Sequence, residues 1–402
     1  MAPSKKAIII GGSLGGLFAA NFMLREGWDV QVYERVAQEL EGRGAGIVTH
    51  PELHDALRAA GIVVDETLGI QVQTRVALSR DGSKLGERAC PQILTAWGRI
   101  YSLLREAFPS ERYHNGKHFV SFAQDPSSVT ARFSDGQEVQ ADLLIAADGL
   151  RSTIRQQLLP EVKPKYAGYV AWRGLVEESV LSERVLTDLF PYFAFDLPPQ
   201  EQMLAYPVAG QGNSVSEGQR RYNFVWYRPA DEGLKLKQML TDANGKHWSE
   251  GIPPPLIRPE LLEQTRAEAR DVLSPQFAEV VCKTEQLFFQ PIFDLESPQL
   301  AFGRIAILGD AAFVARPHCG MGVTKAGSDA YGLSRALKSL SEVPLALKVF
   351  EAERIVSGAR VVAQARALGA YMQAQILTPL EREQAEKYRT PEAVMRETAV
   401  PF

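Results

Sequence analysis

The chain has 402 residues, of which 45% are hydrophobic and 23% are charged. This composition is typical of a globular protein large enough for two domains. The formal net charge of −4 gives no electrostatic reason to expect nucleic acid or a membrane as a partner. The three cysteines are scattered and odd in number, which argues against a disulfide framework and a cysteine-ligated metal site. We therefore expect a cytoplasmic protein that holds no metal.

The N-terminal stretch predicts a dinucleotide-binding unit. An apolar strand over Ala7–Ile10 leads into a glycine-rich turn and then a helix that ends near Gly27. A second strand over Val30–Tyr33 ends at Glu34, and an acid about 20 positions after the glycines is placed to bind a ribose hydroxyl. Ser13 stands where the second glycine of GxGxxG is usual, and its small side chain still permits close approach of a pyrophosphate. The turn consists of Gly11, Gly12, Ser13, Leu14, Gly15 and Gly16.

Two later stretches also place an acid directly after a buried strand. Leu143–Ala147 ends in Asp148-Gly149, ahead of a helix with Ser152 as its expected N-cap. Ile305–Leu308 is followed by Gly309-Asp310 and by a Pro- and Gly-containing turn that feeds a helix near Val323. Such a helix N-terminus offers N–H groups to an anion or an electron-rich ring, and Asp310 can hold a polyol hydroxyl. The turn carries Pro317, His318, Gly320, Met321 and Gly322.

Two further features have an open interpretation. The passage from Arg43 to Val48 includes Gly46, Ile47 and Val48. Its glycines either let the backbone approach a flat ligand closely or simply make a flexible loop. Arg99 begins a predicted helix over Ile100–Phe108 and is either a ligand contact or a solvated helix end.

The middle of the chain has a different pattern from the two flanking parts. Aromatic-rich segments at Val170–Arg173, Leu204–Val208 and Tyr222–Tyr227 predict antiparallel strands, with helical segments over 233–244 and 258–279. A hairpin turn is expected at 134–137. The chain should return to the first domain near Leu287 and continue as helices, 330–340 and 344–371, with a polar tail. The predicted fold class is α/β, a Rossmann-like domain with an inserted antiparallel-sheet domain.

Three co-linear motifs resemble the single-component FAD-dependent aromatic hydroxylases, the group of p-hydroxybenzoate and salicylate hydroxylases. They are GGSLGGL with Glu34-Arg35, AADGLRSTIR, and GDAAFVARPHCGMGVTKAGSDA. Stretches such as GIVTHPEL, YAGYVAWRG and YNFVWY are most similar to hydroxylases of dihydroxypyridines within that family. There are two departures: Phe313 replaces a histidine usual after GDAA, and Met321 replaces the glutamine of a GQG segment.

The resemblance implies a non-covalent FAD and assigns residues to it. Gly11 to Gly16 would hold the pyrophosphate, Glu34 and Arg35 the adenosine ribose, and Asp310 the ribityl chain. Asp148-Gly149 would support FAD and the nicotinamide, while Pro317 and Gly320 to Gly322 would line the isoalloxazine ring. Gly46, Ile47, Val48 and Arg99 complete the expected cofactor contacts.

The resemblance also implies the reaction. NADH or NADPH would visit as a transient co-substrate, since the chain shows no second GxGxxG. O2 would then react, and a flavin C4a-hydroperoxide would transfer one oxygen atom to a hydroxylated aromatic ring, for which a hydroxypyridine is expected. A homodimer is a further expectation from the family.

Three residues are the candidates for the substrate side, and Pro317 is grouped with them in the expected catalytic site. His318 can exchange a proton with an enol or pyridinol, next to Pro317 at the flavin. His50 lies beside the second glycine segment, and Tyr206 can hydrogen-bond a ring oxygen or nitrogen. Each of them has an alternative interpretation as a structural residue. Arg173 and Tyr227 are weaker candidates, and Trp172 and Trp226 are expected in the core.

Other functions and the domain limits complete the hypothesis. A flavoprotein oxidoreductase without oxygen insertion and a non-catalytic FAD-binding sensor remain alternatives, whereas a flavin halogenase is disfavoured because no WxWxIP segment occurs. The expected FAD-binding domain comprises 1–75, 99–165 and 287–350. The expected substrate-binding domain comprises 76–98 and 166–286, and 351–402 is a C-terminal helical segment.

Overall fold

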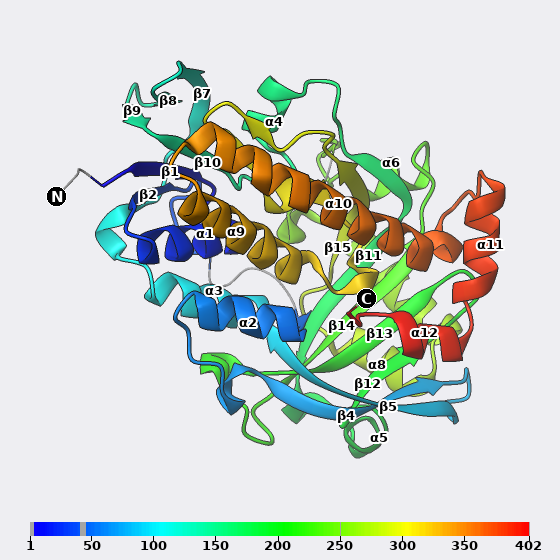
Figure 1. The fold of residues 1–402 in the computed structure, drawn as a ribbon. Coiled ribbons are helices and arrows are strands. Elements are labelled where there is room, and N and C mark those ends of the chain that lie inside the picture. The colour runs from blue at the N-terminus through cyan, green and yellow to red at the C-terminus, as the bar shows by residue number, and fades with distance from the viewer. Residues whose placement is uncertain (1–3, 41–45, 250, 402) are drawn as a thin grey trace.

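The computed structural model describes residues 4–40, 46–249 and 251–401, and within these ranges the strands form three sheets (Figure 1). A six-stranded sheet is parallel except for its edge pair β16–β17. Its central strands β1, β10 and β17 are buried except for Lys6 at the start of β1, as continuous apolar runs predict for a sheet covered on both faces. The order is β16 (Ala301–Phe302), β17 (Ile305–Ile307), β10 (Leu143–Ala146), β1 (Lys6–Ile10), β2 (Asp29–Tyr33) and β6 (Tyr113–His114).

Helices cover one face of this sheet, and a small antiparallel sheet lies beside it. Helix α1 (Leu14–Arg25) packs on α9 (Gly322–Ser339), where the rings of Phe22 and Tyr331 meet edge to face with centroids 5.5 Å apart. In Figure 1, α10 (Val343–Gly369) runs alongside α9. The small sheet consists of β7 (Phe119–Gln124), β8 (Val129–Phe133) and β9 (Glu138–Ala141). The hairpin predicted at 134–137 is confirmed, because it joins β8 to β9.

A nine-stranded sheet forms the second layer and separates a hydrophobic core from the central cleft. Along β14, Trp226 points into the core that α7 and α8 cover, whereas Val225 and Tyr227 line the cleft, following the period of two of a strand. Trp172 and Trp226 are 2% and 0% exposed, which confirms their predicted core positions. The strand order is β18 (Phe313–Val314), β15 (Phe288–Glu296), β11 (Lys165–Glu177), β14 (Arg221–Pro229), β13 (Gln202–Val208), β12 (Tyr192–Asp196), β4 (Ile70–Leu78), β5 (Lys84–Ala96) and β3 (Gly46–Val48).

Membership of the large sheet differs from the sequence expectation at four strands. The chain does not leave this sheet near Leu287, because β15 pairs with β11. It returns to the six-stranded sheet with β16 and β17, and β18 then pairs with β15 in the large sheet. Strands β3 and β4 also belong to the large sheet, although they begin within 1–75. Strand pairing over long sequence distances decides this membership, and local patterns do not encode it. The domain limits themselves stay a prediction.

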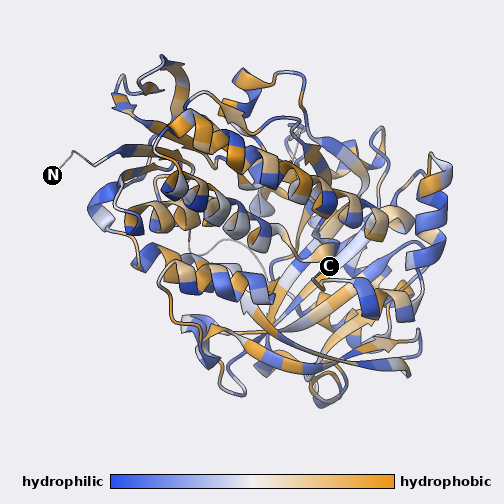
Figure 2. Ribbon diagram, viewed as in Figure 1, coloured by the Kyte–Doolittle hydropathy of each residue, from blue (hydrophilic) through white to orange (hydrophobic). Residues whose placement is uncertain are grey.

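Two helical expectations need correction. The predicted helical segment 258–279 is divided into α7 (Pro259–Val272) and α8 (Pro275–Lys283), because Pro275 cannot continue a helix and restricts the residue before it. The stretch after Tyr371, expected as a polar tail that closes the C-terminal helical segment, contains two helices, α11 (Pro379–Tyr388) and α12 (Pro391–Glu397). Figure 2 shows α11 as largely hydrophilic, which explains why its sequence resembled a tail.

Helices long and apolar enough to cross a membrane are absent from the described part of the chain.

Asp196, at the end of β12, should make the stability of the fold depend on pH. Its side chain is buried and accepts a hydrogen bond from the Ser274 N–H at 2.6 Å. Burial raises the pKa of Asp196 to about 6, above its ordinary value of 3.8. A raised folded-state pKa means that the stability present at low pH is lost as the pH rises through 6, by about 3 kcal/mol.

We therefore expect Asp196→Asn to stabilise the protein above pH 6, because the amide stays neutral and its oxygen can still accept from Ser274. The midpoint of thermal unfolding is measured for both proteins from pH 4.5 to 8. The gain of the variant should grow as the pH rises to about 6 and then level off, and a gain independent of pH would contradict the assignment.

Candidate active site

A continuous cleft runs between the six-stranded sheet and the nine-stranded sheet. Its wide part is a cavity of about 560 Å³ bounded by the nine-stranded sheet and the start of α9. Its narrow part is a cavity of about 320 Å³ beside the carboxyl ends of β1 and β2. The two share the lining residues Ser13, Trp97, Ala147 and Gly149, so a long ligand can occupy both.

The turn between β1 and α1 accepts only glycine at key positions. Gly11 has φ +104°, and a Cβ there would lie 2.3 Å from the Ala147 carbonyl oxygen. A Cβ on Gly16 would lie 1.9 Å from the Gly11 carbonyl oxygen. Ser13 is the N-cap of α1 and makes no side-chain capping bond, so the first-turn N–H groups are available to an anion in the cleft.

Glu34, at the end of β2, is buried at the narrow cavity. Its two carboxylate oxygens accept hydrogen bonds from the N–H groups of Gly12 at 2.8 Å and Val36 at 2.9 Å. Each oxygen keeps a second lone pair for a hydroxyl group. Arg35 and Asp148 line the same cavity. Glu34 and Arg35, which are predicted to bind the adenosine ribose, therefore lie together with Asp148.

Asp148 and Arg155 join the second and third motifs. Asp148 Oδ2 accepts from the N–H groups of Thr153 and Ile154, while its buried Oδ1 has no partner among the described residues. Burial raises the pKa of Asp148. Ser152 caps α4 (Thr153–Leu158) as predicted, by accepting from the Arg155 N–H at 2.9 Å. The buried Arg155 guanidinium donates to the carbonyls of Leu150 and Ala311 at 2.6 and 2.9 Å, which ties the two turns together.

A buried ion network fixes the turn that carries Asp310. Lys325 Nζ donates to the Gly309 carbonyl at 2.9 Å and contacts Asp329 Oδ2 at 3.2 Å. The same oxygen accepts from the Gly309 N–H at 3.1 Å, and Asp329 Oδ1 accepts from Arg354 at 2.9 Å. The Asp310 side chain is accessible from the cleft. Desolvation by the surrounding protein raises the pKa of its carboxyl group.

The following turn forms one side of the wide cavity. Pro317–Cys319 is a single turn of 3-10 helix, Gly320 has φ +64°, and α9 begins at Gly322. Pro317, Gly320 and Gly322 line the cavity. Phe313 is buried against α10, where a Cβ on Gly358 would lie 2.4 Å from its ring. Phe313, which replaces the histidine usual in the family, therefore fills the core and does not face the cleft.

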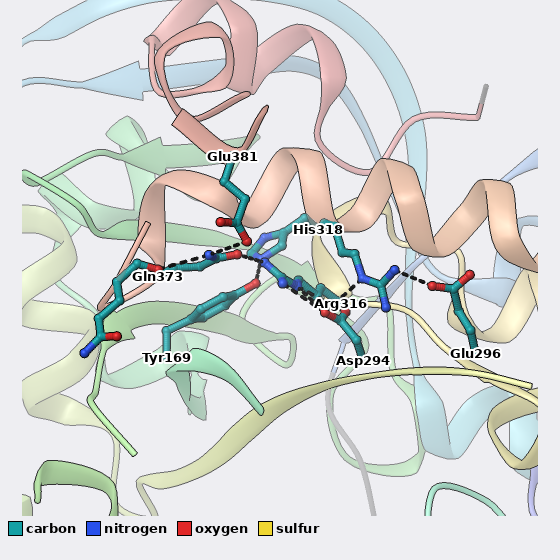
Figure 3. A network of polar contacts seen from close by, with 9 residues as sticks. Tyr169, Asp294, Glu296, Arg316, His318, Gln373 and Glu381 are labelled. Carbon is teal, nitrogen blue, oxygen red and sulfur yellow. Dashed lines mark hydrogen bonds and ion pairs between the residues drawn. The ribbon is translucent and has the colours of Figure 1, made fainter. Parts of the chain in front are cut away.

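His318 is held by a polar network behind the cavity (Figure 3). Its Nε2 lies 2.7 Å from the Tyr169 hydroxyl, and its Nδ1 has no hydrogen-bond partner among the described residues. Burial, with the charges of Arg316 and Arg173, lowers the pKa of His318 to about 3. The imidazole is therefore neutral at neutral pH. Arg316 is fixed by Asp294 at 2.9 Å and by Gln373 at 2.6 Å.

Aromatic and apolar side chains of the nine-stranded sheet make the opposite wall, together with one cation. These are Phe193, Leu204, Tyr206, Val225 and Tyr227, and the cation is Arg173. Burial raises the pKa of Tyr206, and that of Tyr227 to about 12, while the Arg173 charge lowers both. Both phenols therefore stay protonated at neutral pH, near a single guanidinium.

Comparisons with known proteins agree with this geometry. A family model described as FAD binding domain-like matches residues 166–294. The chain is 32% identical to 2,6-dihydroxypyridine 3-monooxygenase of Paenarthrobacter nicotinovorans, over 89% of each chain. The solved 2,6-dihydroxypyridine-3-hydroxylase from Arthrobacter nicotinovorans superposes with a TM-score of 0.87 at 30% identity, covering 92% of this chain and 93% of that one. The chain belongs to the FAD-dependent aromatic monooxygenases. The resemblance drawn from its motifs is thereby confirmed.

A more distant structure shares the fold. The Klebsiella pneumoniae protein HpxO, solved with FAD and uric acid, superposes with a TM-score of 0.77 at 23% identity, over 98% of this chain and 95% of that one. FAD is the cofactor of this aromatic monooxygenase, and the cleft fits it. The tight glycine turn leaves space that a Cβ would fill, and the buried Asp148 Oδ1 has no hydrogen-bond partner among the residues that the structure describes.

Most residues predicted from sequence for the monooxygenase site line the cleft. The residues that do so are Gly11, Ser13, Leu14, Gly15, Glu34, Arg35, Gly46, Ile47, Val48, Asp148, Gly149, Tyr206, Asp310, Pro317, His318, Gly320 and Gly322. Their individual roles stay predictions. Residues 43–45 of the second glycine passage lie outside the described residues.

Five predicted residues do not line either cavity of the described structure. Gly12 and Gly16 pack inside the turn, and Met321 is the N-cap of α9. His50 lies behind the cavity, with Nδ1 3.2 Å from the Thr324 hydroxyl. Arg99 donates to the Thr67 hydroxyl at 2.9 Å.

Sequence reasoning missed several cavity residues. Phe193 alternates with core positions along β12, and this period could have revealed it. Trp97, Gln290, Thr398 and Ala399 also line the cavity, but no local pattern distinguishes them.

We predict that Asp310→Ala weakens FAD retention by the monooxygenase. The substitution removes the carboxylate proposed to hold the ribityl hydroxyls, at a cost of about 1–3 kcal/mol, or about 5–150-fold in Kd. Reconstitution of the apoprotein with FAD, followed by flavin fluorescence, measures the affinity. Asp310→Asn keeps an acceptor and should lose less, whereas unchanged affinity of the alanine variant would exclude the anchor.

Proposed function

We propose that this monooxygenase hydroxylates a hydroxylated pyridine, with NADH or NADPH as reductant and O2 as oxygen donor. The observation that carries the proposal is the cavity beside the 317–322 turn. Its walls are mostly aromatic and apolar, and its volume of about 560 Å³ suits a single ring next to a flavin. The relative at 32% identity is named for 2,6-dihydroxypyridine, which supports the same substrate class here.

Arg173 is the residue that we propose activates the substrate. It is the cationic lining residue of the cavity within the described chain, and its Nε has no hydrogen-bond partner there. Its charge lowers the pKa of Tyr206, Tyr227 and His318, so it would lower the pKa of a ring hydroxyl placed among them. The pyridinolate anion is the more electron-rich ring and the better target for oxygen transfer.

Tyr206 and His318 then act as neutral hydrogen-bonding partners. The Tyr206 phenol stays protonated and can donate to a ring oxygen or nitrogen. His318, with a pKa of about 3, is a neutral ring fixed by Tyr169, so it can orient the substrate but does not store its proton. This supports a positioning role for His318 over the proton exchange expected from sequence.

The cofactor would lie along the whole cleft. FAD supplies the electron transfer from NAD(P)H and the activation of O2. We propose that the β1–α1 turn holds its pyrophosphate, Glu34 and Arg35 its ribose, and Asp310 its ribityl chain. The 317–322 turn would then face the ring system, and the apolar wall would exclude water from the reacting atoms.

The compartment and the assembly are further parts of the proposal. Cys90, Cys282 and Cys319 are free thiols, which supports a reducing compartment such as the cytoplasm. A homodimer stays a prediction from the family.

Oxygen labelling tests the reaction class. With 18O2, NAD(P)H and 2,6-dihydroxypyridine, we expect one labelled hydroxyl group in the product by mass spectrometry. Label from H2 18O in the product would contradict oxygen insertion from O2. A product that forms without oxygen uptake would favour a flavoprotein oxidoreductase. A flavin that NAD(P)H does not reduce in the presence of any ring compound would favour a sensor.

The charge of Arg173 provides a second test. Arg173→Met should lower kcat/KM by about 10²–10³-fold, the usual cost of removing one donor to a developing anion. It should also raise the pKa of the bound ring hydroxyl, seen in the pH dependence of the substrate spectrum. Arg173→Lys keeps the charge and should retain more activity. Normal turnover of the methionine variant with FAD bound would remove Arg173 from the reaction.

A further inference from the structure

One wall of the substrate cavity comes from a segment far along the chain. Thr398 and Ala399 follow α12 and line the wide cavity, together with Ser13 and Gly15 near the start of the chain. Both residues are buried, at 3% and 4% exposure. We call residues 398–399 the distal wall.

Arg75 on β4 anchors the distal wall from the sheet side. Its side chain is fully buried at 0% exposure. The Nη1 group donates to the carbonyls of Met395 at 2.9 Å and Thr398 at 2.6 Å, and Nη2 donates to the Ala399 carbonyl at 3.2 Å. Gln92 Nε2 donates to the Ala399 carbonyl at 2.8 Å, and Gln92 Oε1 accepts from Arg75 Nε at 3.1 Å. A buried guanidinium is thus used to hold backbone carbonyls.

The distal wall is also fixed to the turn on the flavin side. The Ala399 N–H donates to the His318 carbonyl at 2.7 Å. The Ala399 Cβ would lie 3.0 Å from a Cβ on Gly320, so the two segments are in close contact. Ala399 has φ +51°, a backbone conformation that costs energy for a residue other than glycine. Contacts on both sides hold Ala399 in this conformation.

Arg75 supports a second wall at the same time. Its guanidinium lies over the Phe193 ring, 4.9 Å from the centroid. Phe193 meets the ring of Tyr206 edge to face, with centroids 5.0 Å apart, and both rings line the cavity. Two adjoining sides of the cavity therefore depend on one buried cation.

We propose that the distal wall, clamped by Arg75 and Gln92, sets the size of ring that the cavity accepts and shields the reacting atoms from water. Arg75 and Gln92 are positioning residues here, because they act through Thr398, Ala399 and Phe193. The inference rests on the proposed function, since it concerns the substrate of that site. A closed wall confines a single ring, and an open one admits a bicyclic ring and water.

The experiment compares variants of the clamp with a matched control. Arg75→Met removes the donors at similar length, and Arg75→Lys restores a cation that can reach carbonyls. Arg88→Met is the control, because Arg88 is paired with Arg75 across β4 and β5 but is exposed. A chain that ends at Glu397 removes the wall directly. Gln92→Leu changes a half-buried residue and tests the clamp even if Arg75→Met does not fold.

Four quantities are measured for each holoprotein: FAD per chain, the unfolding midpoint, the Kd of 2,6-dihydroxypyridine and 2-hydroxyquinoline from flavin absorbance, and peroxide released per NAD(P)H. The clamp variants should retain FAD. Their preference for the monocyclic over the bicyclic ring should fall at least about tenfold, with more peroxide. Arg75→Lys should recover part of the preference for the monocyclic ring. Arg88→Met should show the same preference as the parent.

The outcomes separate the inference from the proposed function. An unchanged ring preference in the Glu397-ended chain and in Gln92→Leu, with FAD bound, would overturn the role of the distal wall. If the parent neither binds nor hydroxylates either ring compound, the proposed substrate class fails instead. Lower stability with an unchanged preference would make the clamp purely structural, and this too would overturn the inference.

Discussion

The buried contact between Lys325 and Asp329 is the interaction on which the site depends. Both side chains are almost fully buried, and between them they bond both the N–H and the carbonyl of Gly309. Such a pair is expensive to desolvate, and loss of one partner would leave a buried charge. Arg354 from α10 adds a further contact to Asp329. The pair therefore fixes Asp310 at the cleft and joins α9 and α10 to the sheet edge.

Among the described residues, the ionisable side chains that line the wide cavity are few, namely Arg173, Asp310 and the neutral His318. Arg173 is surrounded by aromatic side chains and by a histidine whose pKa of about 3 keeps it neutral. In low-dielectric surroundings a single cation acts strongly on a bound anion. The network of Arg316, Asp294 and Gln373 behind His318 is internally paired (Figure 3). This arrangement is the reason for proposing that Arg173 acts on the substrate, with the other groups as neutral hydrogen-bonding partners.

The family assignment and the site geometry support each other. A relative at 32% identity over 89% of the chain establishes the family, and the cleft explains in physical terms why the three motifs are needed. Arg155 from the second motif bonds the carbonyl of Ala311 in the third, and Gly11 of the first motif packs against Ala147 of the second. The motifs are thus parts of one close-packed edge of the parallel sheet.

The sequence by itself determined the parallel unit, its three turns, the inserted antiparallel strands and the family. Those features are local, because a glycine turn, a strand-end acid or an alternating strand is encoded by neighbouring residues. The tertiary structure alone decided that β15 stays in the large sheet, that His318 is neutral and bonded to Tyr169, and that residues 398–399 line the cavity. These depend on pairings between residues far apart in the chain and on burial, which shifts a pKa only once the surrounding elements have packed.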